Sequence, residues 1–213
     1  MSEPINLPTR VQAMGVVKEQ LSRWRSDGKR VLVGFDFAFG YPAGFSTALG
    51  LTTSEVAWKA VHTHFAAHVR DSPVNASNRD AFAEACNLAV GAPGPFWGWG
   101  RTAASAALTQ HRVGVFNYPH HGLAEWRVTD MEAKKKATTQ SVWKLNCGVS
   151  VGGQTILGIK YLDELARAVA GHRWPFEGWG IPHVPTIWLA EIFPSLVYYS
   201  DWVEEYQPPR LAE

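Results

Sequence analysis

The stretch VLVGFDFAFGYP, residues 31–42, decides the fold class that the sequence predicts. It is an apolar run that one carboxylate, Asp36, interrupts just before a Gly-Tyr-Pro turn. A near-continuous apolar run favours a strand covered on both faces, as in an α/β protein. A charge is costly to bury unless it is paired, hydrogen-bonded or bound to a metal. Asp36 is therefore the first candidate site residue.

A second segment, TIWLAEIFPS at residues 186–195, repeats this arrangement far downstream. It is an apolar strand pattern that carries Glu191 before a Pro-Ser break. Two acids at the ends of two core strands are what a shared divalent-metal or acid–base site needs. The alternative is structural: each acid accepts backbone N–H bonds in its following turn or pairs with an arginine.

The rest of the chain shows alternating helix and strand patterns. Between residues 11 and 24, apolar residues recur at spacings of three and four, which predicts an amphipathic helix. Helices and strands in alternation indicate an α/β fold with a sheet flanked by helices. Further helices are predicted over residues 52–69, 79–90 and 155–170, and strands over residues 30–37, 112–116, 125–129, 141–145 and 187–192.

Length and composition predict one α/β domain over residues 1–213, with residues 200–213 as a docked or disordered tail. A hydrophobic content of 46% and a charged content of 18% argue against wholesale disorder. The net charge of +1 gives no electrostatic case for nucleic acid, although a site can be locally basic. Two cysteines, with no signal peptide and no membrane-spanning run, lead us to expect a cytoplasmic protein that does not bind membranes.

Several motifs, taken in order, resemble a bacterial family of unknown function predicted to be nucleases with a ribonuclease H-like fold. These motifs are GFDFAFGYPAGF, NRDAFAEACN, GPFWG, SVWKLNCGVSVGGQTILGI and LAEIFPSL, and together they cover nearly the whole chain. The resemblance implies a mixed sheet flanked by helices. It also implies metal-binding acids on three strands, of which Asp36 and Glu191 fill the second and third. The chain begins at the helix that follows the first strand, so we expect an incomplete fold. A homodimer through the exposed sheet edge would cover that edge.

The implied activity is metal-dependent hydrolysis of a phosphodiester, with nucleic acid or a nucleotide as partner. Asp36 and Glu191 would hold Mg²⁺ or Mn²⁺ as metal ligands and catalytic acids, and Lys144 would lie near the phosphate. Whether the chain is an enzyme stays open, because the acid of the first strand is absent.

Asn78, Arg79 and Glu84 open a predicted helix and are candidate substrate-binding residues. Arg79 could clamp a phosphate or pair with Asp36, and the alternative is a surface ion pair with a helix cap. Gly152 and Gln154 lie in a loop, GVSVGGQT, whose backbone N–H groups would suit an anion. That loop matches neither the Walker A nor the dinucleotide-binding pattern, and a tight turn with ordinary helix packing is its alternative.

Tryptophan-rich loops support a second function, a non-catalytic protein that binds a nucleotide or a flat cofactor. Trp97 and Trp179 lie in Gly/Pro-rich loops and could stack on a base. The alternative is that these rings pin long loops onto the core.

Two weaker patterns complete the list of candidates. His64 and His68 share a helix face, but the glutamate of the HExxH zinc motif is missing, which favours exposed or hydrogen-bonded histidines. Ser150 lies in a G-x-S-x-G pattern, which makes a serine hydrolase a third hypothesis, although the downstream Asp and His order fits it poorly.

Overall fold

The computed structural model describes residues 4–51, 55–98, 105–146, 150–180 and 184–196. The sheet and helices found there confirm the α/β character, whereas the ribonuclease H-like fold and the single domain stay predictions. The predicted tail at 200–213 lies outside the described residues. In chain order the elements are α1 (Arg10–Ser26), β1 (Val31–Phe35), α2 (Phe45–Ala48), α3 (Ala57–His68), α4 (Arg79–Val90), α5 (Val128–Ala133), α6 (Gly152–Val169), β2 (His172–Trp174), β3 (Ile187–Glu191) and the 3-10 helix η1 (Pro194–Leu196).

The strands form one sheet in the order β1-β3-β2, and both pairings are parallel. The expected mixed sheet is thus wrong for the described part of the chain, where every strand pair is parallel. In the register of β1 and β3, Val31 lies opposite Ile187 and Phe35 opposite Glu191. The carboxyl ends of all three strands therefore meet at one edge of the sheet, which brings Asp36 and Glu191 to the same place.

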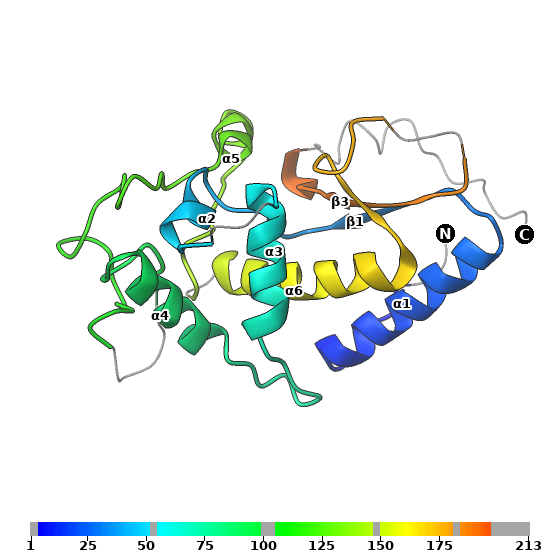
Figure 1. Ribbon diagram of the computed structural model, residues 1–213, viewed down its shortest axis with the longest axis horizontal. Helices are drawn as coiled ribbons and strands as arrows, with labels where there is room; N and C mark the ends of the chain where they lie inside the picture. The colour runs from blue at the N-terminus through cyan, green and yellow to red at the C-terminus, as the bar shows by residue number, and fades with distance from the viewer. Residues whose placement is uncertain (1–3, 52–54, 99–104, 147–149, 181–183, 197–213) are drawn as a thin grey trace, which may run out of the picture.

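Helix α6 connects two hydrophobic clusters. Figure 1 shows α6 beneath β1 and β3, with α3 and α1 beside it, and both helices contact α6. The first half of α6 packs Ile156 and Ile159 among the aromatic side chains of α2, α3 and the loops around them. The second half packs Leu162 and Leu165 against α1 and the sheet. A helix that is apolar on most sides must be covered on most sides, so α6 organises the core.

The two faces of β1 differ. Val31, Val33 and Phe35 pack toward α1 and α6, whereas Leu32, on the opposite face, is 61% exposed. Alternate side chains of a strand point to opposite faces, so one face of β1 is left uncovered and the expectation of a strand buried on both faces is wrong. Trp188 of β3 lies opposite Leu32 but is buried. Within the described residues β1 pairs only with β3, and the homodimer through its free edge stays a prediction.

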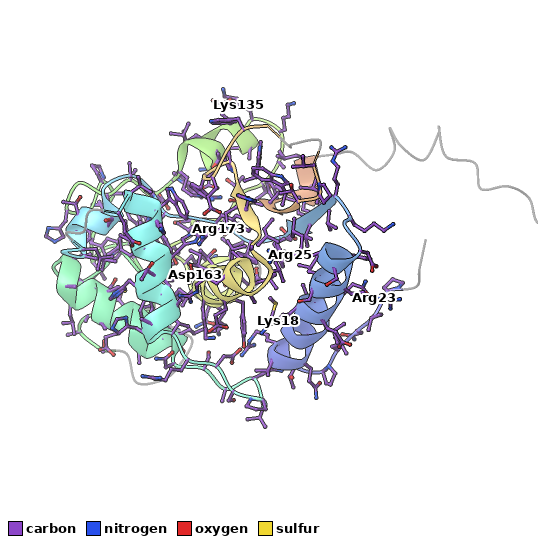
Figure 2. The ribbon with its side chains drawn as sticks, turned by 45° about the vertical axis from the view of Figure 1, so that its right-hand side comes forward. Lys18, Arg23, Arg25, Lys135, Asp163 and Arg173 are labelled. Atoms are coloured by element: carbon purple, nitrogen blue, oxygen red, sulfur yellow. The ribbon has the colours of Figure 1, made fainter. Side chains whose placement is uncertain are left out.

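A buried ion pair ties α6 to β2. The Nη1 of Arg173 donates to Oδ1 of Asp163 over 2.9 Å, and both side chains are less than a tenth exposed. Arg173 also donates to Glu177, and Arg167 pairs with the second carboxylate oxygen of Asp163. Figure 2 shows Asp163 and Arg173 close together in the middle of the molecule, whereas Lys18, Arg23 and Arg25 lie along α1. Such a pair is costly to break, because the remaining charge would stay buried.

The three short strands predicted over residues 112–116, 125–129 and 141–145 are absent from the described chain. Residues 112–116 form turns, and most of the second segment precedes α5. The third segment is buried without joining the sheet: Trp143 is fully buried and its carbonyl accepts the N–H of Trp97. The predicted helix bounds are closer to the structure for α4, which has the predicted ends, and for α6, which begins three residues earlier. The helix predicted over residues 52–69 is α3, which begins only at Ala57.

A pair of glycine substitutions tests the packing of α6. A Cβ at Gly158 would collide with the ring of Phe37, whereas a Cβ at Gly15 in α1 would meet nothing within 4 Å. In a helix, Ala in place of Gly normally stabilises by about 1 kcal/mol. We expect Gly15→Ala to show this gain and Gly158→Ala to lose about 1–2 kcal/mol through overpacking. Urea unfolding of both variants measures this, and a stabilised Gly158→Ala would contradict the packing described.

Candidate functional site

A cavity of about 350 Å³ lies at the carboxyl ends of the strands. It is lined by the residues that follow β1, by α5, by the segment before α6, by Trp174 at the end of β2 and by the end of β3. Ligands of open α/β sheets bind at this edge, beyond the carboxyl ends of the strands. The volume lies in the range of small-molecule sites. Asp36 and Glu191 both line this cavity, so the structure brings the two predicted acids together.

The carboxylate of Glu191 is held by protein donors. Its Oε2 accepts the backbone N–H of Phe39 over 2.9 Å and Nη1 of Arg127 over 2.8 Å. Its Oε1 accepts Nη2 of Arg127 over 2.7 Å. Both structural alternatives for this acid are therefore realised together, a backbone N–H bond and a bidentate arginine pair. To bind a metal ion, Glu191 would have to exchange at least part of its contact with Arg127.

Asp36 has a different environment. It is exposed at the end of β1, and within the described residues its carboxylate has no hydrogen bond or ion pair. The described residues contain no group of three or more His, Cys, Asp or Glu side chains placed to hold a metal ion. Mg²⁺ accepts one or two carboxylates with water as its remaining ligands. The residues present therefore fit a weakly held Mg²⁺ or Mn²⁺ at Asp36, and they do not form a preassembled cage.

Arg127, at the N-cap of α5, is a site residue that the sequence reasoning missed, as it missed Asp130, Thr139 and Trp174. Besides Glu191 it binds Asp130, with Nη2 to Oδ1 at 2.7 Å and Nε to Oδ2 at 3.0 Å. Burial alone would lower the pKa of Arg127, but the hydrogen bonds to Glu191 and Asp130 outweigh it and raise the pKa, so the guanidinium stays charged. Asp130 three residues after Arg127 was the available signal, because an acid at this spacing can accept the N–H of the N-cap residue, as Oδ2 of Asp130 does from Arg127 over 3.0 Å.

The cavity carries an excess of negative charge. Three carboxylates (Asp36, Asp130 and Glu191) and one guanidinium (Arg127) line it, so its formal charge is −2 among the described residues. Clefts of one sign concentrate ligands of the opposite sign. A cation, or a ring that presents hydrogen-bond donors, is favoured here over a bare phosphate.

Two tryptophans line the cavity on the side of β2. The rings of Trp174 and Trp179 lie 6.0 Å apart at 82°, and Nε1 of Trp174 donates to the carbonyl of Trp179 over 3.3 Å. Trp179, which the sequence indicated as a stacking residue, is 80% exposed. Such a large exposed ring is an open surface on which another flat ring can stack.

An unsatisfied polar group also lines the cavity. Thr139 is 9% exposed, and its hydroxyl has no hydrogen-bond partner within the described residues. Buried polar groups normally have a partner, so a group of this kind beside a cavity is a place where a ligand can supply one.

A second set of predicted residues gathers at the start of α6. The carbonyl of Lys144 accepts the N–H of Gly152 over 2.9 Å, and the Nζ of Lys144 lies 5.8 Å from the ring centre of Trp97. Arg79 donates to Oδ1 of Asn146 over 2.9 Å and does not pair with Asp36. The set borders the cavity, because Nζ of Lys144 lies 3.5 Å from Oε1 of Gln140, which lines it.

Asn78 has a structural role. Its Oδ1 accepts the N–H of Arg70, and its Nδ2 donates to the carbonyl of His68. These two bonds close the turn between α3 and α4. Glu84 and Gln154 do not line the cavity, and Gln154 is exposed on α6. The Oγ of Ser150, the candidate nucleophile, donates to the carbonyl of Leu145 over 3.1 Å.

No family model, no curated protein and no solved structure matches the chain. The resemblance to ribonuclease H-like nucleases therefore stays a prediction, and the candidate site is defined by its geometry. Among the described helices, none is both long enough and apolar enough to cross a membrane.

Replacing Arg127 tests its electrostatic role. Arg127→Met would leave Asp130, which is buried, and Glu191 without their shared cation. We expect a loss of about 3 kcal/mol in the free energy of unfolding, the cost of an unpaired buried charge. Arg25→Met, at an exposed residue with no ion pair in the described chain, should change stability by less than about 0.5 kcal/mol. Urea unfolding compares the two, and equal stabilities would contradict the role assigned to Arg127.

Proposed function

We propose that this protein binds a flat, nitrogen-rich ring of the nucleobase type in the cavity at the carboxyl ends of the strands. The observation that carries the proposal is that an exposed indole, Trp179, lines the same cavity as Asp36, a carboxylate with no partner among the described residues. The ring would stack on Trp179, and its N–H donors would bind Asp36.

The chemistry of the cavity supports a ring with several donors. Among the described residues Asp36 has no partner that a ligand would have to displace, whereas Glu191 is bound by Arg127. The buried hydroxyl of Thr139 adds a polar group without a described partner. A hydrogen bond to a charged group contributes about 1.5–3 kcal/mol, and stacking of a base on an aromatic side chain about 1–3 kcal/mol. Together these contacts favour a ring that both stacks and donates hydrogen bonds over a ring that does only one of the two.

The charge of the cavity limits where a phosphate could go. A nucleotide would place its phosphate away from the three carboxylates or bring a cation with it. Lys144, beside Gln140 at the border of the cavity, is a predicted cationic residue to which the phosphate could extend. Neutral nucleosides are therefore the first ligands to test.

Titration with adenosine, guanosine and cytidine by calorimetry tests ring binding. At least one nucleoside should bind, and Trp179→Ala should weaken that binding by about tenfold or more through lost stacking. Asp36→Asn should weaken it to a similar extent, because the charged acceptor is lost. Trp24→Ala is the matched control, since Trp24 is also partly exposed but lies on α1 and does not line the cavity. Absence of binding by all three nucleosides, or equal affinities in Trp179→Ala and wild type, would exclude the proposal.

A second function, metal-dependent phosphodiester hydrolysis, is favoured by Asp36, which ends a strand in a negatively charged cavity and has no partner in the part of the chain that the structure describes. Asp36 would hold Mg²⁺ or Mn²⁺, and Glu191 would join it only by exchanging at least part of its contact with Arg127. A bound ion of this kind polarises a phosphoryl oxygen and activates water. Lys144 would orient the phosphate from the border of the cavity.

Thermal unfolding with and without Mn²⁺ tests this second function. Mn²⁺ should raise the melting temperature of the wild type, because an ion that binds only the folded state stabilises it by mass action. Asp36→Asn should lose the effect, and Asp27→Asn, at an exposed residue outside the cavity, should keep it. Hydrolysis of bis(p-nitrophenyl) phosphate should follow the same pattern. A melt that does not respond to Mn²⁺ would leave ring binding as the function of the cavity.

A further inference from the structure

The last turn of α3 carries two histidines whose rings lie together. The ring centroids of His64 and His68 are 4.4 Å apart at an interplanar angle of 34°. Residues four apart on a helix share a face, which the sequence already indicated. What the sequence could not show is which hydrogen bonds the ring nitrogens make. These bonds decide which nitrogens can bind a metal.

The hydrogen bond of His68 leaves one ring nitrogen free. Its Nδ1 lies 2.8 Å from the carbonyl oxygen of His64. A carbonyl only accepts, so Nδ1 carries the proton and the neutral ring keeps its lone pair on Nε2. Histidines that ligate metals commonly donate their other ring N–H to a carbonyl in this way, which fixes the tautomer and the ring orientation.

The ring of His64 packs against α4. It lies 5.7 Å from the ring of Phe82 on α4, and the residue is half-buried. Within the described residues no hydrogen bond occupies either ring nitrogen of His64. The pair therefore combines one oriented imidazole with one that has no competing partner.

The donor set and its position favour a transition-metal ion. Imidazole suits Cu²⁺, Ni²⁺ and Zn²⁺, whereas Mg²⁺ and Mn²⁺ prefer oxygen ligands. His68 is the last residue of α3, where the negative end of the helix dipole favours a cation. Since the described residues hold no group of three metal-binding side chains, water would complete the coordination.

We propose that His64 and His68 form a two-histidine site for a first-row transition ion, with Cu²⁺ bound more tightly than Ni²⁺ or Zn²⁺. The ion joins two positions one helical turn apart and so stabilises the end of α3 that leads toward α4. The site lies on a different element from the cavity and does not depend on the function proposed for it.

Calorimetric titration of the full chain with NiCl₂ tests the proposal. One Ni²⁺ should bind per chain, and His64→Gln and His68→Gln should each lower the affinity at least about tenfold, the loss that even outer-shell changes cause at metal sites. His111→Gln is the matched control, because His111 is an exposed residue between α4 and α5 and not part of α3, and this variant should bind Ni²⁺ as the wild type does. Melting curves without metal confirm that each variant is folded, and His68 is exposed, so its replacement should leave the fold intact.

Two results of this titration would overturn the proposal. Wild-type protein without measurable Ni²⁺ binding would refute it. So would binding that survives in His64→Gln and disappears in His121→Gln, because the rings of His120 and His121 also lie 4.4 Å apart and would then be the site.

Discussion

The burial of α6 is the constraint on which the rest of the structure depends. Its first half lies in the aromatic cluster and its second half against α1 and the sheet. The contact at Gly158 connects this packing to the site, because the missing side chain lets the ring of Phe37 lie on the helix. That contact places the segment after β1, where Asp36 reaches the cavity and the N–H of Phe39 binds Glu191. The buried pair of Asp163 and Arg173 ties the same helix to β2.

The two acids at the strand ends differ in the partners that surround their carboxylates. Glu191 is neutralised by Arg127 and belongs to the structure of the cavity wall. Asp36 has no such partner in the described chain and is open to a ligand. The sum of charges, together with the exposed ring of Trp179, favours a donor-bearing ring or a cation in this cavity. Both proposed functions depend on Asp36, and they differ in what it binds.

Strong local patterns predicted the elements well. The capped, periodic segment 79–90 forms α4 with the predicted ends, and the apolar runs around Asp36 and Glu191 form neighbouring parallel strands. The short apolar segment at residues 141–145 was predicted wrongly as a strand. It is buried, but Trp143 fills the aromatic cluster from a loop, and a short apolar run indicates burial without indicating how the backbone is paired. The same limit applies to β1, where Leu32 is apolar but exposed, because burial also depends on what packs against each face.

The sequence by itself determined that Asp36 and Glu191 end two strands and that Trp179 lies in a Gly/Pro-rich loop. These are local features, set by residue type and spacing. Only the tertiary structure decided what each side chain meets. Arg127 is 64 residues from Glu191, and Phe39 is 152 residues from it, yet both bind its carboxylate. Contacts over such separations follow from how α6 and the sheet pack together, and no local pattern encodes them. For the same reason, only the folded chain could show that Asp36 has no partner among the described residues.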